Sequence, residues 1–258
     1  MENNQAIGIF DSGIGGTSIW KEIHHLLPNE KTIYLADSKN APYGQKSKEE
    51  IIELSMKNTD FLLQMNCKLI VVACNTATTN AIKELREKYD VPFIGIEPAI
   101  KPAATNSKTQ TIGILATQGT LNSELFHRTV QKYESTKIIE QVGHGLVQLI
   151  ESGKINSPEM TQLLYSYLNP MIDANIDYLV LGCSHYPYLI PQIKKILPNH
   201  IQIIDSGEAV AKQTQHLLQE KIGFNTQKHV ETLFYTNTDP SVLKQILENK
   251  YEVSQIDF

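Results

Sequence analysis

Residues 6–18 read AIGIFDSGIGGTS, an apolar run that ends at an aspartate and continues into a glycine-rich turn. A strand that leads through such a turn into a helix is typical of a parallel α/β unit and resembles a dinucleotide-binding loop. The match to that loop is partial, because Ser18 stands where its third glycine would be. Asp11 at the mouth of the turn would also repel a phosphate held by backbone N–H groups. Either Asp11 is structural, or the turn serves a ligand other than a nucleotide.

The strand-and-helix pattern of this stretch recurs along the whole chain. Helical stretches such as residues 79–89 and 188–197 follow most of the short apolar runs. These runs, rich in Ile and Val, cover residues 6–10, 32–36, 68–73, 92–96, 111–116, 137–142, 178–182 and 201–205. Continuous apolar strands that alternate with helices predict an α/β fold with mainly parallel sheets buried on both faces.

The sequence also contains an internal similarity. IGIFDS, starting at Ile7, resembles IGILAT, which starts 105 residues later at Ile112. LIVVACNT at residues 69–76 resembles LVLGCSH at residues 179–185, at nearly the same spacing. Chance likeness between strands is one interpretation, but two matches at one spacing favour two similar, pseudo-symmetric α/β domains.

The predicted domain organisation is discontinuous, with the functional site in the cleft between the domains. Residues 1–97 and 207–258 are expected to form the first domain, and residues 98–206 the second. The stretch IDSGEAVAKQT at residues 204–214 is typical of a turn and helix that return the chain to the first domain.

The composition narrows the possible partners. The chain has 258 residues and a formal net charge of −5. This charge offers no basic surface, so a nucleic-acid partner is not expected. The polar first residues and the short apolar runs indicate neither a signal peptide nor a membrane span, so a cytoplasmic protein is expected. Three cysteines in a reducing compartment predict free thiols.

Two of the cysteines have matching positions. Cys74 and Cys183 each follow an apolar strand and precede a small polar residue and a helix. Ligands of open α/β sheets bind at the carboxyl ends of the strands, so two facing domains would bring both thiols to one cleft. A helix N-terminus also favours the thiolate. Cys67 precedes its strand, and we expect it to be a buried structural thiol.

Three chemistries could use such a pair of thiols. A cysteine phosphatase needs an arginine six residues after its nucleophile, and Asn80 and Leu189 occupy those positions. A zinc site lacks a close ligand pair and stays a weaker alternative, with the ligands Cys74, Cys183, His185 and Asp11. The third possibility is two-base proton transfer, in which thiols on opposite walls of the cleft invert a stereocentre, one tuned by Asp11 and the other by His185.

At these residues the chain closely resembles the glutamate racemases, cofactor-independent members of the aspartate/glutamate racemase superfamily. The resemblance rests on an ordered set of motifs: FDSGIGG (10–16), PYG (42–44), ACNTA (73–77), GCSHYP (182–187) and IDSG (204–207). It implies racemisation of L- and D-glutamate without cofactor or metal, to supply D-glutamate for peptidoglycan synthesis. Members of the family are often homodimers, and the resemblance implies a homodimer here.

The resemblance also implies roles for individual residues. Cys74 and Cys183 would be the two proton donors and acceptors, assisted by Asp11 and His185. Glu151 matches a carboxylate that the family places beside the second thiol, although a solvated helix residue is an equal alternative. The residues expected to line the glutamate site are Asp11, Ser12, Tyr43, Gly44, Asn75, Thr76, Ser184 and His185.

Two other functions are consistent with parts of this pattern. Aspartate racemases typically have glutamate where His185 stands and lack the FDSGIGG and PYG series, so glutamate is favoured. A two-lobed binding protein would need no paired thiols and would be expected to carry a signal peptide. The departures from the family pattern are small: Ser184 replaces the usual threonine, Ala36 replaces the usual glycine before Asp37, and residues 38–44 lack a common arginine.

Overall fold

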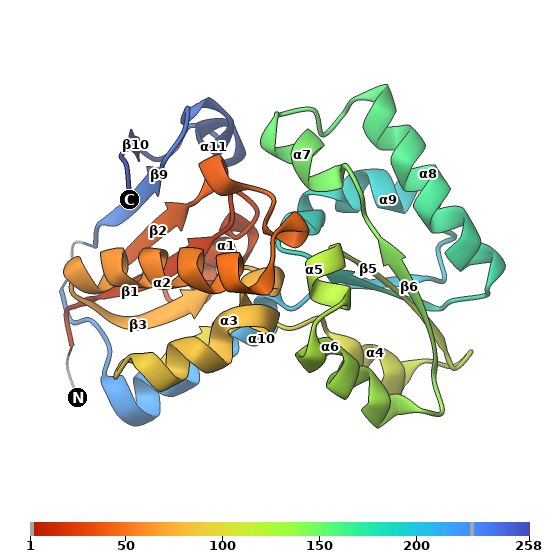
Figure 1. Cartoon of the computed structure of the whole chain (residues 1–258), viewed down its shortest axis with the longest axis horizontal. Coiled ribbons are helices and arrows are strands. Elements are labelled where there is room, and N and C mark those ends of the chain that lie inside the picture. The colour runs from red at the N-terminus through yellow and green to blue at the C-terminus, as the bar shows by residue number, and fades with distance from the viewer. Residues whose placement is uncertain (1–2, 228–229) are drawn as a thin grey trace.

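Two parallel sheets organise the computed structural model, which describes residues 3–227 and 230–258. The larger sheet has the strand order β10-β9-β2-β1-β3-β4. Its strands are β1 (Ala6–Asp11), β2 (Thr32–Ala36), β3 (Cys67–Val72), β4 (Phe93–Gly95), β9 (Thr232–Thr236) and β10 (Val253–Gln255). The smaller sheet has the order β6-β5-β7-β8, built from β5 (Thr111–Ala116), β6 (Lys137–Val142), β7 (Tyr178–Gly182) and β8 (Gln202–Ile204). Figure 1 shows the two sheets in separate lobes.

The internal similarity of the sequence is reproduced in the strand order. The first lobe contains the series β2-β1-β3-β4 and the second the series β6-β5-β7-β8. In both series the strand that comes first along the chain lies between the second and the third. β1 and β5 carry the two matching IGI runs, and β3 and β7 precede the two matching cysteines. The predicted α/β class, with two similar domains and mainly parallel sheets, is confirmed.

Helices connect the strands and cover the sheets. In the first lobe they are α1 (Thr17–Leu26), α2 (Lys48–Gln64), α3 (Asn75–Lys88), α10 (Gly207–Leu217) and α11 (Ser241–Ile246). In the second they are α4 (Ile100–Asn106), α5 (Gln118–Leu121), α6 (Glu124–Val130), α7 (Leu146–Glu151), α8 (Pro158–Asp173) and α9 (Ile190–Ile196). None of the helices in the described residues is both long and apolar enough to cross a membrane.

The chain crosses between the lobes twice. It leaves the first sheet after β4, and after β8 it returns through α10, which packs against α1. The two crossings are joined by a hydrogen bond that the Ser206 hydroxyl donates to the carbonyl of Glu97. We propose domain boundaries at these crossings, so that residues 1–97 and 207–258 form one domain and residues 98–206 the other.

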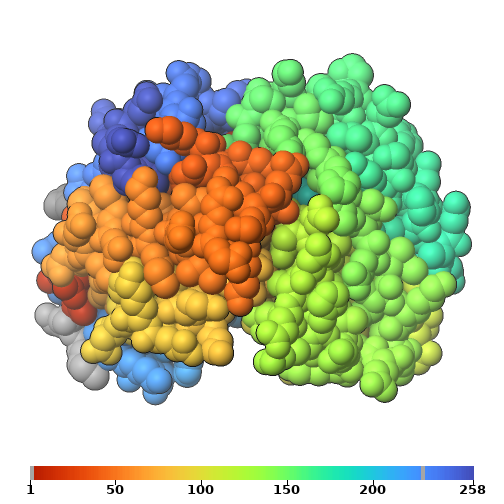
Figure 2. Space-filling model, in the orientation of Figure 1, coloured from red at the N-terminus to blue at the C-terminus, as the bar shows by residue number. Residues whose placement is uncertain are grey.

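The lobes meet along a closely packed seam. Residues 43–45 form a short 3-10 helix that contacts α5 of the second lobe. A Cβ atom on Gly44 would lie 2.7 Å from the Cβ of Thr117, which shows how little space separates the two backbones. Figure 2 shows this seam as the boundary between the orange and green surfaces. The carboxyl ends of β1, β3, β5 and β7 face it, as expected for a site at strand ends.

Candidate active site

Asp11 is the last residue of β1, and its carboxylate is fully buried. Oδ2 accepts a hydrogen bond of 2.8 Å from the backbone N–H of Gly16, and Oδ1 accepts one of 3.1 Å from the hydroxyl of Ser184. Burial raises the pKa of Asp11, and the nearby His185 opposes that shift. The two oxygens therefore join the turn after β1 to the segment after β7.

The glycines of the turn after β1 make room for side chains of the other lobe. A Cβ atom on Gly13 would lie 2.0 Å from Oε1 of Glu151, and one on Gly15 would lie 2.2 Å from Nδ1 of His185. Contacts this short are not possible, so any side chain at either position would displace an ionisable group. The turn resembles a nucleotide loop in sequence, but here its open space is filled by a carboxylate and an imidazole.

Cys74 is the N-cap of α3 and its thiol is almost completely buried. The sulfur accepts a hydrogen bond from the backbone N–H of Ala77 at 3.4 Å and lies 3.5 Å from the hydroxyl oxygen of Ser12. Burial raises the pKa of Cys74 most, and Asp11 and Cys183 raise it further. The thiol is thus strongly held in its protonated form.

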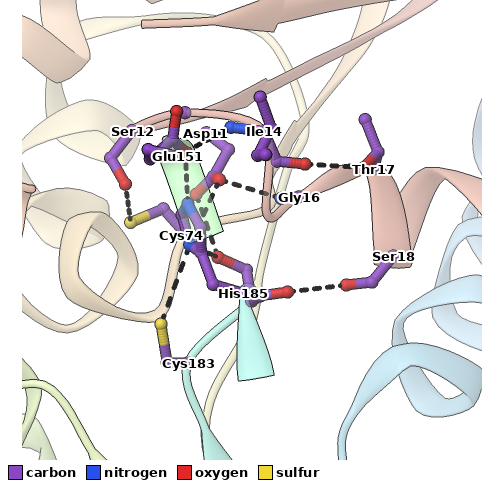
Figure 3. Close-up of polar contacts among 12 residues, drawn as sticks. Asp11, Ser12, Ile14, Gly16, Thr17, Ser18, Cys74, Glu151, Cys183 and His185 are labelled. Atoms are coloured by element: carbon purple, nitrogen blue, oxygen red, sulfur yellow. Dashed lines mark hydrogen bonds and ion pairs between the residues drawn. The ribbon is translucent and has the colours of Figure 1, made fainter. Parts of the chain in front are cut away.

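Cys183 follows β7 and has different partners. Its sulfur lies 3.8 Å from Nδ1 of His185, and Nε2 of the same ring lies 2.5 Å from Oε1 of Glu151. Burial lowers the pKa of His185, but the contacts with Cys183, Glu151 and Asp11 together raise it well above its ordinary value. The imidazole is therefore protonated, and it lies between a thiol and a carboxylate (Figure 3).

Glu151 ends α7 in the second lobe, yet its carboxylate also contacts the first lobe. Oε1 accepts a hydrogen bond of 2.7 Å from the backbone N–H of Ile14, and Oε2 accepts one of 2.8 Å from the hydroxyl of Ser38. The side chain is only 14% exposed. The alternative of a solvated helix residue is therefore wrong.

Asn75 begins α3 and is 2% exposed. Both polar atoms of its side-chain amide are buried and lack a hydrogen-bond partner among the described residues. Buried amides are nearly always paired in folded proteins, so an unpaired one next to Cys74 indicates the position of a polar ligand.

Thr76 contacts two hydroxyl groups of the second lobe. Its Oγ1 lies 2.8 Å from that of Thr117 and 3.3 Å from that of Thr120. The sequence analysis missed Thr117 and Thr120, although a signal was present. Thr117 follows β5 at the position that corresponds, in the internal similarity, to Ser12 after β1.

Two of the expected site residues make contacts outside the group around the thiols. The buried hydroxyl of Tyr43 donates to Oδ2 of Asp37 at 2.5 Å and accepts from Asn58 at 3.1 Å. Gly44 packs against Thr117 at the seam between the lobes. Cys67 is buried, as expected, but the prediction that it precedes its strand is wrong, because it is the first residue of β3.

The thiols lie in an enclosed part of the seam. Cys74 and Cys183 are 3% and 6% exposed. A cavity of about 980 Å³ is lined by residues such as Lys83, Arg86 and Arg128, and neither thiol lines it. Within residues 3–227 and 230–258, no cluster of three or more His, Cys, Asp or Glu side chains is arranged to hold a metal ion, so the zinc alternative gains no support.

The fold and these contacts agree with comparisons to known proteins. The model of the Asp/Glu/Hydantoin racemase family matches residues 7–214. This chain belongs to that family. The match runs from β1 into α10, so it includes both thiols and both lobes.

Several proteins that resemble this chain over nearly its whole length are named glutamate racemases. The enzyme of Pseudomonas entomophila is 43% identical over 248 residues, which are 95% of this chain and 94% of the relative. The solved structure of a glutamate racemase isoform from Bacillus anthracis has a TM-score of 0.87 and 32% identity, covering 98% of this chain and 97% of that one. The glutamate racemase of Francisella tularensis, solved in complex with D-glutamate, has a TM-score of 0.86 and 31% identity, with 98% of each chain covered.

Proposed function

We propose that this protein is a glutamate racemase, in which Cys74 and Cys183 transfer protons on opposite faces of the substrate α-carbon. The observation that carries the proposal is the pair of buried thiols at equivalent strand ends, each with its own polar partners. The similarity to enzymes named glutamate racemase over both lobes supports glutamate as the substrate.

Two thiols are needed because inversion exchanges a proton across a tetrahedral carbon. In the direction from L- to D-glutamate, the Cys183 thiolate takes the α-proton and becomes a thiol. The Cys74 thiol then gives its proton to the opposite face and becomes a thiolate. In the reverse direction Cys74 takes the proton and Cys183 returns one. The raised pKa of Cys74 fits the protonated donor of the first direction.

The neighbours of each thiol support these proton transfers. Asp11 and Ser12 lie beside Cys74, and the protonated imidazole of His185, held by Glu151, lies beside Cys183. The positive imidazolium lies 3.8 Å from the Cys183 sulfur, where it can offset negative charge during the transfer. We propose that Asp11, His185 and Glu151 are the groups that tune the proton affinity of the two thiols.

The substrate must also be held while its α-carbon carries negative charge. The α-proton lies beside a carboxylate and is only weakly acidic, so the intermediate needs many hydrogen-bond donors. The unpaired amide of Asn75 and the N-terminus of α3 are well placed to supply them. We propose that the remaining substrate contacts come from Ser12, Tyr43, Gly44, Thr76, Ser184 and His185.

This mechanism uses protein side chains for every proton transfer, and we propose that it proceeds without cofactor or metal. By family resemblance, the product D-glutamate would be used in peptidoglycan synthesis, and the enzyme would act in the cytoplasm as a homodimer.

The experiment that tests the activity is incubation of the purified protein with L-glutamate in D₂O. We expect the optical rotation to fall to zero and the α-proton signal to disappear, without any added cofactor. L-Aspartate, under the same conditions, is the control for substrate class. An unchanged rotation with an intact α-proton, in folded protein, would refute the proposed function.

A further inference from the structure

The carboxylate of Glu151 receives hydrogen bonds from both sides of the seam. Its Oε1 is shared by the imidazole of His185, from its own lobe, and the backbone N–H of Ile14, from the first lobe. Its Oε2 accepts a hydrogen bond from the hydroxyl of Ser38, which also belongs to the first lobe. Ser38 is thus the first-lobe side chain that fixes this carboxylate.

We propose that Ser38 is a positioning residue for racemisation: it orients Glu151 and thereby holds the imidazole of His185 beside Cys183. This inference rests on the proposed function, because it assigns Ser38 to the proton transfers made by Cys183. Through this contact, the first lobe would adjust an acid/base group that belongs to the second.

The geometry explains why one hydroxyl has this effect. Two contacts on Oε1 fix the position of that oxygen but leave the carboxylate free to rotate about it. The contact on Oε2, at 2.8 Å, sets the plane of the carboxylate and so the direction from which Oε1 accepts the imidazole N–H. The Glu151 side chain has three rotatable bonds, so these contacts together are needed to define its conformation.

Ser38 itself is rigidly held. The preceding Asp37 donates its backbone N–H to the carbonyl of Asp11 at 3.0 Å, and its buried carboxylate accepts a hydrogen bond of 2.5 Å from Asn237. The backbone N–H of Lys39 donates to the side chain of the same Asn237 at 2.9 Å. Both neighbours of Ser38 are therefore fixed to the first lobe, and they hold the Ser38 hydroxyl in place relative to that lobe.

Three variants test this role: Ser38→Ala removes the hydroxyl, Ser38→Thr retains it, and Lys39→Ala alters the exposed side chain next in sequence. We expect Ser38→Ala to lower kcat about tenfold in both directions, the effect of one lost hydrogen bond to a charged group, with KM changed less than about threefold. Ser38→Thr should restore kcat to within about threefold of the unaltered protein. The kcat of Lys39→Ala should equal that of the unaltered protein.

A second measurement separates positioning from general damage. The imidazole of His185 is followed by nitrogen NMR across pH and assigned with a His185→Asn variant. A less well oriented Glu151 stabilises the imidazolium less, so Ser38→Ala should titrate His185 at lower pH.

An unchanged kcat, an unchanged His185 titration, or an equal loss in Lys39→Ala would each overturn the inference. If the unaltered protein does not racemise glutamate, the proposed function fails, and the His185 titration alone then decides whether Ser38 positions Glu151.

Discussion

Cys74 and Cys183 occupy equivalent positions in the two lobes but have unequal surroundings. Cys74 contacts a hydroxyl and a backbone N–H at the start of a helix, with Asp11 close enough to raise its pKa. Cys183 faces an imidazole that is held by a carboxylate. In the proposed mechanism neither thiol could replace the other, because each would act on one face of the substrate.

Replacement of either thiol should therefore abolish racemisation. We expect Cys74→Ala and Cys183→Ala to lose activity about a thousandfold or more in both directions, since inversion needs a group on each face. Binding of glutamate should be largely retained. The measurement is racemisation from each enantiomer in folded protein, and Cys67→Ala is the matched control. Near-normal turnover by either active-site variant would contradict a two-base mechanism.

The raised pKa of His185 predicts a pH dependence of stability. Its folded-state pKa lies well above the ordinary value near 6.5, so the folded protein binds this proton more tightly than the unfolded chain. The stabilisation is complete below about pH 6.5 and is lost as pH rises through the folded-state pKa. We therefore expect wild type to lose more stability between about pH 6.5 and pH 9 than His185→Asn does. Denaturant unfolding checks this, with His25→Asn as the exposed control.

At the scale of elements, the turn between β1 and α1 has the clearest consequence. Its glycines are required by what lies next to them, since the imidazole of His185 fills the space beside Gly15 and the carboxylate of Glu151 fills that beside Gly13. The strand places the turn, and the turn shapes one wall of the site.

Gly15→Ala should accordingly remove activity. The new methyl group would lie 2.2 Å from Nδ1 of the His185 ring and 2.6 Å from the backbone nitrogen of the same residue, so both the ring and the backbone that carries it must shift. We expect kcat to fall about a hundredfold or more, as for other misplaced catalytic groups. Gly207→Ala is the control, because its methyl group would meet the flexible side chain of Glu22 at 3.0 Å. Equal activity of the two variants would contradict this role for Gly15.

The predictable elements are those whose own residues determine them. The apolar runs predicted β1 to β8, and the strand ends predicted the positions of Asp11, Cys74 and Cys183. β9 and β10 were missed; β10 has three residues, two of them exposed, and it is defined by pairing with β9. Ser38 was also missed, because its partner Glu151 is 113 residues away in sequence and is brought near only when the lobes pack.

At the scale of the whole molecule, the two lobes are joined by hydrogen bonds all around the thiols. Besides the contacts of Glu151, the Ser18 hydroxyl donates to the carbonyl of Ser184 at 2.9 Å, and the hydroxyls of Thr17 and Tyr188 lie 2.6 Å apart. Because both thiols are nearly inaccessible, the proposed site would admit glutamate only if part of this seam opens. Opening of the seam would then contribute to the affinity for glutamate.

Thr117→Val tests the contribution of the seam. The change keeps the shape of the side chain but removes a hydroxyl that contacts Thr76 across the lobes and also contacts Thr120 as the N-cap of α5. We expect KM for both enantiomers to rise about three- to tenfold, the effect of the hydrogen bond lost across the lobes. Thr129→Val is the control, since the Thr129 hydroxyl donates to Leu125 within α6. An unchanged KM for Thr117→Val would exclude a contribution of this contact to substrate binding.

The discontinuous first sheet also has a consequence for biosynthesis. β2 lies between β1 and β9, although β9 is about 200 residues further along the chain. A ribosome releases the N-terminal end first, so all four strands of the second sheet emerge before β9 does. During that interval β2 has an unpaired edge, and such edges promote association with other chains. The nascent protein thus passes through a stage in which the second lobe can fold although the first lobe still lacks β9 and β10.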